Sequence, residues 1–164
     1  MKHIGLLSDT HTFIHPKIFD FFESCDEIWH AGDIGCIEAA DELNAFKPLK
    51  AVYGNIDGFD VRNVYPEHQR FFCEGVDVWI THIGGYPGHY ADQVRNQIKI
   101  HPPKLFISGH SHILKVINDK KYNLLHINPG AAGKYGFHQV ITFVKFTIDG
   151  TNIADLKICE LKKG

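Results

Sequence analysis

Two short stretches of this chain carry paired side chains that could bind a metal ion. Asp9-Thr10-His11 places a carboxylate and an imidazole two residues apart, and Gly109-His110-Ser111-His112 places two imidazoles on either side of one small residue. Carboxylate oxygens and imidazole nitrogens are ligands of Mn, Fe, Zn and Ni. Asp9 with His11 alone would be more typical of an ordinary polar loop, so the assignment depends on further ligands elsewhere in the chain.

Three more polar side chains, Asp33, Asn55 and His82, also follow short apolar runs. The full candidate set is then seven donors: Asp9, His11, Asp33, Asn55, His82, His110 and His112. The absence of cysteine from this set argues against a structural zinc site. Seven donors are too many for one ion with an open position, but they suit two ions that share a carboxylate. Such pairs of ions cleave phosphoesters.

The first half of the chain alternates predicted strands and helices. Apolar runs at 2–8, 27–31 and 49–53 are typical of buried strands, and the stretches at about 15–25 and 37–46 are typical of helices. This alternation predicts parallel strands, whose carboxyl ends meet at one edge of the sheet. The candidate ligands in this half all follow those strand ends, so we expect them to lie together.

The second half of the chain has a different pattern. Residues 70–74 and 76–81 predict a hairpin that turns near Gly75 and leads into His82. A helix is expected at about 89–100, and a buried strand at 105–107 leads into the histidine pair. The remaining apolar or alternating runs predict antiparallel strands at 114–118, 122–127, 140–147 and 153–158. We therefore expect one α/β domain over residues 1–164, with two sheets packed face to face and helices outside.

Composition excludes several classes of protein. The chain has 164 residues and a formal net charge of −2, without long runs of one sign, so neither specific nucleic-acid binding nor membrane binding is expected. No apolar run is long enough for a membrane span, and the four cysteines form no CxxC motif. These features indicate a cytoplasmic protein with reduced thiols, which could form a homo-oligomer.

The ordered series of motifs resembles a known family. Asp-x-His, Gly-Asp, Gly-Asn, His and Gly-His-x-His follow one another over residues 9–112 as in the calcineurin-like metallophosphoesterase superfamily. The short chain and its Gly-Asn-x-Asp form are similar to the small bacterial and archaeal phosphodiesterase branch. Asn128-Pro129-Gly130 extends the likeness weakly. The resemblance implies a four-layer αββα sandwich with two mixed sheets.

The resemblance also implies a cofactor and a reaction. It implies two divalent ions per chain, with Mn expected and Fe, Zn or Ni as alternatives. A hydroxide that bridges the ions would attack the phosphorus of a small phosphoester in line, and a phosphodiester is favoured over a phosphomonoester. The implied ligands are Asp9, His11 and His112 for a first metal, Asn55, His82 and His110 for a second, and Asp33 between them.

The chain departs from the family pattern beside Asn55. That residue would bind a metal and direct its amide N–H towards the phosphate, and Asp57 would support catalysis from nearby. The larger family has a histidine after the asparagine that helps the leaving group depart, whereas this chain has Ile56. We therefore expect activated leaving groups such as nitrophenolate to be preferred, unless His138 or His89 substitutes. Ile83 stands where the small branch often has glycine, so the following loop and substrate choice could differ.

Other interpretations of these residues are weaker or stay open. A serine nucleophile in G-x-S-x-G would need glycine where Ile113 stands, and the H-x-H-x-D-H pattern would need aspartate where Leu114 stands. His30 could orient Asp33 or could be a buried structural histidine. The alternative function is a metal-binding scaffold of the same fold with little or no turnover, and a retromer scaffold subunit resembles this branch. Retention of all seven ligands favours an enzyme.

Overall fold

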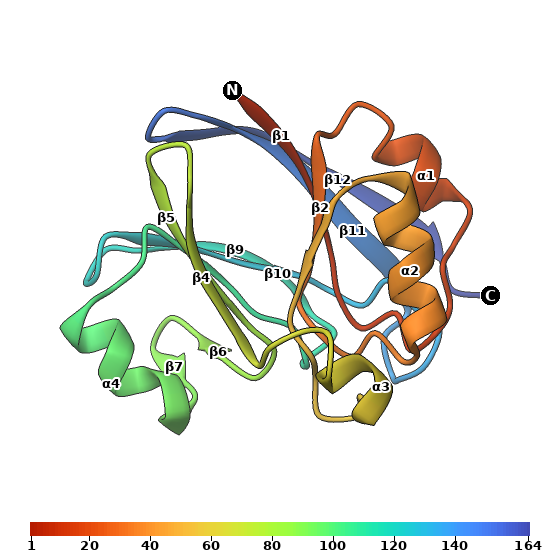
Figure 1. The fold of residues 1–164 in the computed structure, drawn as a ribbon. Helices are drawn as coiled ribbons and strands as arrows, with labels where there is room; N and C mark the ends of the chain where they lie inside the picture. The colour runs from red at the N-terminus through yellow and green to blue at the C-terminus, as the bar shows by residue number, and fades with distance from the viewer.

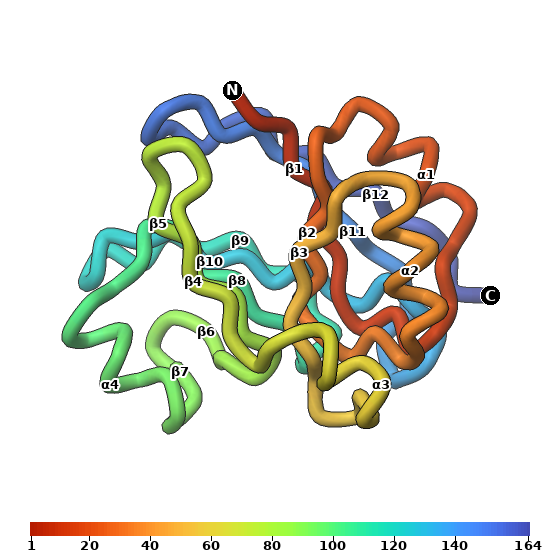
Figure 2. Tube along the Cα trace, viewed as in Figure 1, coloured from red at the N-terminus to blue at the C-terminus, as the bar shows by residue number.

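Two five-stranded sheets form the centre of the computed structural model, which describes residues 1–164 (Figure 1). The first sheet has the order β12 (Asn152–Lys162), β11 (Val140–Asp149), β1 (Lys2–Leu7), β2 (Glu27–His30) and β3 (Leu49–Ala51). The second has the order β4 (His68–Cys73), β5 (Val76–Thr81), β8 (Leu105–Ile107), β10 (Leu124–Pro129) and β9 (Leu114–Asp119). Figure 2 shows β3 beside β2, and β8 beside β10.

Helices cover the outer faces of both sheets. The helices are α1 (Lys17–Phe21), α2 (Ile37–Phe46), α3 (Phe59–Arg62) and α4 (Asp92–Ile100). Ile18 and Leu43 of α1 and α2 belong to a buried cluster with Phe143 of β11, whereas Val94 of α4 packs in a cluster with Trp79 of β5. Figure 1 shows α1 and α2 on one side of the molecule and α4 on the other. The predicted αββα arrangement is therefore confirmed.

The core between the sheets explains why these strands form. In β1, Ile4 and Leu6 belong to the inter-sheet cluster, and they meet residues such as Val78 and Ile80 of β5 there. Leu7 instead belongs to the cluster under the helices. This alternation is the period-two pattern of a strand that is buried on both faces.

Strand register brings the ends of several strands to the same level. The strands β1, β2 and β3 are parallel, with Leu7 opposite His30 and His30 opposite Ala51. In the second sheet, β5 and β8 are parallel, with Ile80 opposite Ile107. Each set of carboxyl ends therefore forms one edge, and the loops that follow both edges carry the candidate ligands.

Several boundaries differ from the sequence prediction. The helix expected at 89–100 begins only at Asp92, because residues before it form a small hairpin of β6 (Gly85–Tyr86) and β7 (His89–Tyr90). Gly85 and Gly88 have φ values of +73° and +85°, which a helix does not allow. The helix expected at 15–25 is limited to α1, the short α3 was not predicted, and β10 lies two residues later than expected.

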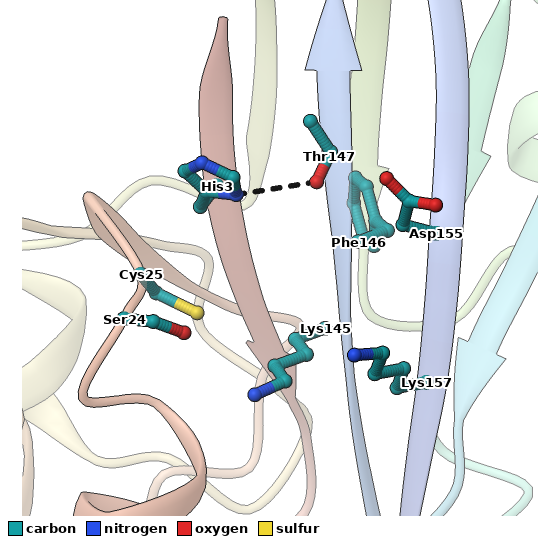
Figure 3. Close-up of a pocket in the computed structure, with 8 residues that line it drawn as sticks. All are labelled: His3, Ser24, Cys25, Lys145, Phe146, Thr147, Asp155 and Lys157. Atoms are coloured by element: carbon teal, nitrogen blue, oxygen red, sulfur yellow. Dashed lines mark hydrogen bonds between the residues drawn. The ribbon is translucent and has the colours of Figure 1, made fainter.

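One cavity lies far from the ligand loops. It has a volume of about 430 Å³ and lies beside β11 and β12, where Lys145 and Lys157 are paired in register (Figure 3). His3, at the amino end of β1, lines it and has its Nδ1 atom 3.2 Å from the Thr147 hydroxyl. This cavity contains none of the candidate ligands.

No helix of the structure is long and apolar enough to cross a membrane.

Candidate metal centre

The structure gathers the predicted donors into two adjacent groups. Potential ligand atoms lie within 4.8 Å of one another in each group, which are Asp9, His11 and His112, and Asp33, His82 and His110. Asn55 joins the second group, because its Oδ1 atom lies 3.1 Å from Nδ1 of His110. All seven predicted donors therefore lie at the paired strand edges.

Asp33 lies between the two groups. Its Oδ2 atom is 3.2 Å from Nε2 of His82 in the second group and 3.5 Å from Nε2 of His11 in the first. Its other oxygen, Oδ1, accepts the backbone N–H of Ile56 at 3.0 Å. The carboxylate is thus held by one oxygen and presents the other to both groups.

Asp9 is oriented in the same way. Its Oδ2 atom accepts the Ser8 hydroxyl at 2.6 Å and the backbone N–H of His110 at 3.1 Å. Its Oδ1 atom has no hydrogen-bond partner and lies 3.3 Å from Nε2 of His112 and 3.7 Å from Nε2 of His82. The sequence analysis did not identify Ser8, although its position between an apolar run and Asp9 was a usable signal.

The buried His82 has one ring nitrogen occupied and the other directed at the carboxylates. Its Nδ1 atom lies 2.7 Å from the carbonyl oxygen of Ala31, which accepts a hydrogen bond from Nδ1–H in the neutral ring. Its Nε2 atom then has a free lone pair towards Asp33 and Asp9, as a metal ligand requires. Burial lowers the pKa of His82, but the two facing carboxylates outweigh burial and raise it overall.

Charge and burial also shift the pKa values of two neighbouring ligands. Burial alone would raise the pKa of Asp33, but the nearby His82 and the N–H of Ile56 lower it overall. For His110, burial is the largest influence and lowers the pKa, and the neighbouring His82 lowers it further. These shifts favour an ionised Asp33 and a neutral His110, which are the forms that bind metals.

The backbone at the centre is held in an uncommon conformation. Five of the seven donors have φ values between +45° and +72°: Asp9, His11, Asp33, His110 and His112. This left-handed region is unfavourable for residues other than glycine and is typical of functional sites. Gly54 also packs tightly here, because a Cβ atom at that position would fall 2.1 Å from Oδ1 of Asp33.

The unpaired atoms of the centre provide a test for a metal. Oδ1 of Asp9, Nε2 of His11 and Nε2 of His82 are buried without hydrogen-bond partners. A buried polar atom without a partner costs about 1–3 kcal/mol, and a divalent cation in each group would satisfy all three. The two groups contain histidine and aspartate without cysteine, and Asn55 adds an amide oxygen, so the donor set fits first-row transition metals rather than a thiolate-bound ion.

Asp57, which is expected to support catalysis from nearby, is bound to the backbone of two ligand loops. Its Oδ2 atom accepts backbone N–H groups of Ile34 at 3.1 Å and Gly54 at 2.8 Å, and its Oδ1 atom accepts that of Gly35 at 2.8 Å. Asp57 therefore ties the loop after Asp33 to the loop of Asn55. Both oxygens are engaged with the backbone instead of facing the ligand groups.

His30 belongs to the framework behind the ligands. Its Nδ1 atom accepts the backbone N–H of Gly32 at 3.1 Å, and its Nε2 atom lies 3.0 Å from the hydroxyl of Thr10. That hydroxyl donates to the carbonyl of Ile34. Complete burial lowers the pKa of His30 to about 4, so a neutral ring connects the loops that carry Asp9 and Asp33.

The two histidines considered as substitutes for the missing family histidine lie in different places. His138 has its Nε2 atom 2.7 Å from the carbonyl of Gly133, and its Nδ1 atom is buried, so neither nitrogen is open to a substrate. His89 and His110 both line a cavity of about 190 Å³. His138 packs against the ring of His112, whereas His89 has an exposed side chain and shares a cavity with a ligand.

Comparisons with known proteins agree with this geometry. Residues 1–151 match the calcineurin-like phosphoesterase superfamily domain. A probable metallophosphoesterase of Methanothermobacter thermautotrophicus is 30% identical over 138 residues, which cover 78% of this chain and 76% of that protein.

Solved structures share the fold. A novel archaeal phosphodiesterase is 22% identical with a TM-score of 0.76, over 97% of this chain and 99% of that one. Vps29 of Chaetomium thermophilum is 16% identical with a TM-score of 0.75, over 100% of both chains. At these identities the likeness concerns the fold, and the family assignment depends on the sequence matches.

Proposed function

This chain belongs to the calcineurin-like phosphoesterase superfamily, and we propose that it hydrolyses small phosphodiesters with two divalent metal ions. The position of Asp33 carries the proposal. Its Oδ2 atom faces His82 at 3.2 Å and His11 at 3.5 Å, one from each ligand group. A carboxylate placed in this way suits a ligand shared by two ions.

The proposed chemistry divides between the ions and the side chains. When bound, the two ions would polarise the phosphoryl group and lower the pKa of a water molecule for attack on phosphorus. The side chains fix the positions of charge before the reaction, since Asp9 and Asp33 are each held by one oxygen. Asn55 would bind the second ion and donate its amide N–H to a phosphate oxygen. Such preorganised charge is a large contribution to catalysis.

The residue after Asn55 limits the leaving groups that this centre can release. Ile56 is 46% exposed and cannot donate a proton. A leaving group that is stable as an anion, such as nitrophenolate, needs no general acid. We therefore propose a preference for activated esters, with His89 as the proton donor if alkoxides are released.

Two observations support a diesterase that uses manganese. One structural relative with the same fold is described as an archaeal phosphodiesterase, which favours diesters. The mixture of histidine nitrogens and carboxylate oxygens suits Mn²⁺, with Fe, Zn or Ni as alternatives.

The test combines metal content with hydrolysis. We expect the Mn²⁺-loaded protein to hydrolyse bis-p-nitrophenyl phosphate faster than p-nitrophenyl phosphate. His82→Ala should abolish both activities, whereas His68→Ala, which alters a histidine on β4 outside the two groups, should retain them. A fully metallated protein that hydrolyses neither compound, nor any cyclic nucleotide, would overturn the proposal in favour of a scaffold.

A further inference from the structure

Exposed apolar side chains occur on three loops that carry or contact ligands of the candidate metal centre. We call four of them the apolar rim: Ile56, Ile113, Tyr135 and Phe137, which are 46%, 55%, 71% and 101% exposed. Ile56 directly follows Asn55, and Ile113 directly follows His112. Single exposed apolar residues are common, but a group of them around one site is typical of a binding surface for an apolar ligand.

Tyr135 is the member of the rim with the most direct relation to the ligands. Its ring stacks on the imidazole of His11, with ring centroids 4.9 Å apart and an angle of 28° between the planes. Nε2 of the same imidazole is directed at Asp33. Since Tyr135 is 71% exposed, its face away from His11 is open to a second flat ring beside the metal centre.

The loop that carries Tyr135 and Phe137 is held against the first ligand group. A Cβ atom at Gly136, which has a φ of +129°, would fall 2.4 Å from Nδ1 of His112, so the backbone passes directly over that ligand. Lys163 donates to the carbonyl of Gly136, and the ring of His138 is hydrogen-bonded to Gly133. These contacts fix the loop, on which Tyr135 and Phe137 are both largely exposed.

The rim determines what kind of ester group could bind. Aliphatic and aromatic side chains gain free energy by covering apolar surface, and rings prefer stacked or edge-to-face contact with other rings. An alkyl or sugar group has no aromatic ring and would cover the open face of Tyr135 less completely. A planar ring attached through the ester oxygen to a phosphate at the metals would cover it.

On the basis of the proposed phosphodiesterase function, we propose that the substrates are esters that carry a planar aromatic ring, which stacks on Tyr135. The ring could be a simple aryl group or a nucleobase, since both offer the same flat apolar face. For a simple aryl group this assignment agrees with Ile56, because aryl oxides leave without a general acid. Tyr135 is thereby a specificity-determining residue.

The test measures binding rather than turnover. Phenylphosphonate and methylphosphonate share the metal-binding group and cannot be hydrolysed as esters, so their dissociation constants from the Mn²⁺-loaded protein isolate the effect of the ring. Stacking on an exposed aromatic side chain is expected to favour phenylphosphonate by about tenfold. Isothermal titration calorimetry gives both constants and the metal content is checked in the same samples.

Three variants make the measurement specific. Tyr135→Ala should reduce the ratio of the two dissociation constants to less than about twofold, whereas Tyr135→Phe should retain the wild-type ratio. Phe72→Ala provides the matched control, because Phe72 is also 71% exposed but lies on β4 in the second sheet. A wild-type protein that prefers neither phenylphosphonate nor a nucleobase, or a Tyr135→Ala variant that keeps the wild-type preference, would overturn the inference.

Two further comparisons distinguish a nucleobase from a simple aryl group, and failure of this inference from failure of the proposed function. Adenosine 5′-monophosphate against ribose 5-phosphate reveals a nucleobase preference, and either a nucleobase or a simple aryl preference at Tyr135 supports the ring assignment. Hydrolysis of bis-p-nitrophenyl phosphate without any ring preference overturns this inference alone. A ring preference in a metallated protein that hydrolyses no ester overturns the proposed function but supports the stacking role of Tyr135.

Discussion

Removal of the Asp57 carboxylate should destabilise the protein strongly, because Asp57 accepts three backbone N–H groups. The donors are Ile34, Gly35 and Gly54 at distances of 2.8–3.1 Å. In Asp57→Ala these N–H groups lose their acceptor, at about 1–3 kcal/mol for each buried group. Partial access of water to the Gly35 side reduces the sum, so we expect the free energy of unfolding to fall by about 4 kcal/mol.

Asp57→Asn separates loss of charge from loss of shape. One amide oxygen can still accept from Ile34 and Gly54, but the amide nitrogen would face the N–H of Gly35. We expect this variant to lose about 2 kcal/mol. Because the two loops also carry Asp33 and Asn55, its affinity for Mn²⁺ should fall about 10–100-fold, as for other residues that orient metal ligands.

The assay is urea unfolding of the metal-free variants, followed by Mn²⁺ titration. Asp60→Ala is the matched control, because Asp60 accepts a single backbone N–H, from Ile37 at an exposed position, and should cost less than about 1 kcal/mol. If Asp57→Ala lies within 1 kcal/mol of this control, the three-bond argument is refuted.

Three other predictions test the centre and the core. Asp33→Ala should remove both ions, as measured by elemental analysis, and two retained ions per chain would contradict a shared carboxylate. Gly54→Ala places a Cβ atom 2.1 Å from Oδ1 of Asp33, so it should weaken metal binding and cost about 1–3 kcal/mol in urea unfolding; unchanged values would refute the close contact. Burial lowers the pKa of His126 to about 4 from 6.5, so its neutral form contributes stability that is complete above pH 6.5 and is lost as pH falls towards 4, about 3 kcal/mol in total. His126→Asn should flatten this dependence in the metal-free protein, and an unchanged slope would contradict it.

The ligand positions could be predicted because they follow from local patterns. Asp9, Asp33 and Asn55 come after short apolar runs that alternate with helical stretches, and parallel pairing of such runs aligns their ends. The observed register, with Leu7 opposite His30 and His30 opposite Ala51, reproduces this alignment. The spacing of apolar residues and the order of strands and helices were therefore sufficient to predict the two sheets and the position of the donors at the strand ends.

Other features depend on contacts that local patterns do not contain. Tyr135 reaches His11 because the loop after β10 crosses the first ligand group at Gly136, a contact between segments far apart in sequence. Asp57 faces backbone N–H groups of a loop 22 or 23 residues earlier. The small hairpin before α4 depends on the positive φ values of Gly85 and Gly88. The sequence shows where these glycines are but not their φ values, so it did not distinguish the hairpin from the start of a helix.

The central claim is that two metal ions share Asp33 at the paired strand edges. Anomalous diffraction at the manganese edge from Mn²⁺-soaked crystals measures this directly. We expect two peaks about 3.5–4 Å apart, one beside the Asp9 group and one beside the Asn55 group, with the Asp33 carboxylate between them. A single peak, or two peaks that do not both contact Asp33, would contradict the account.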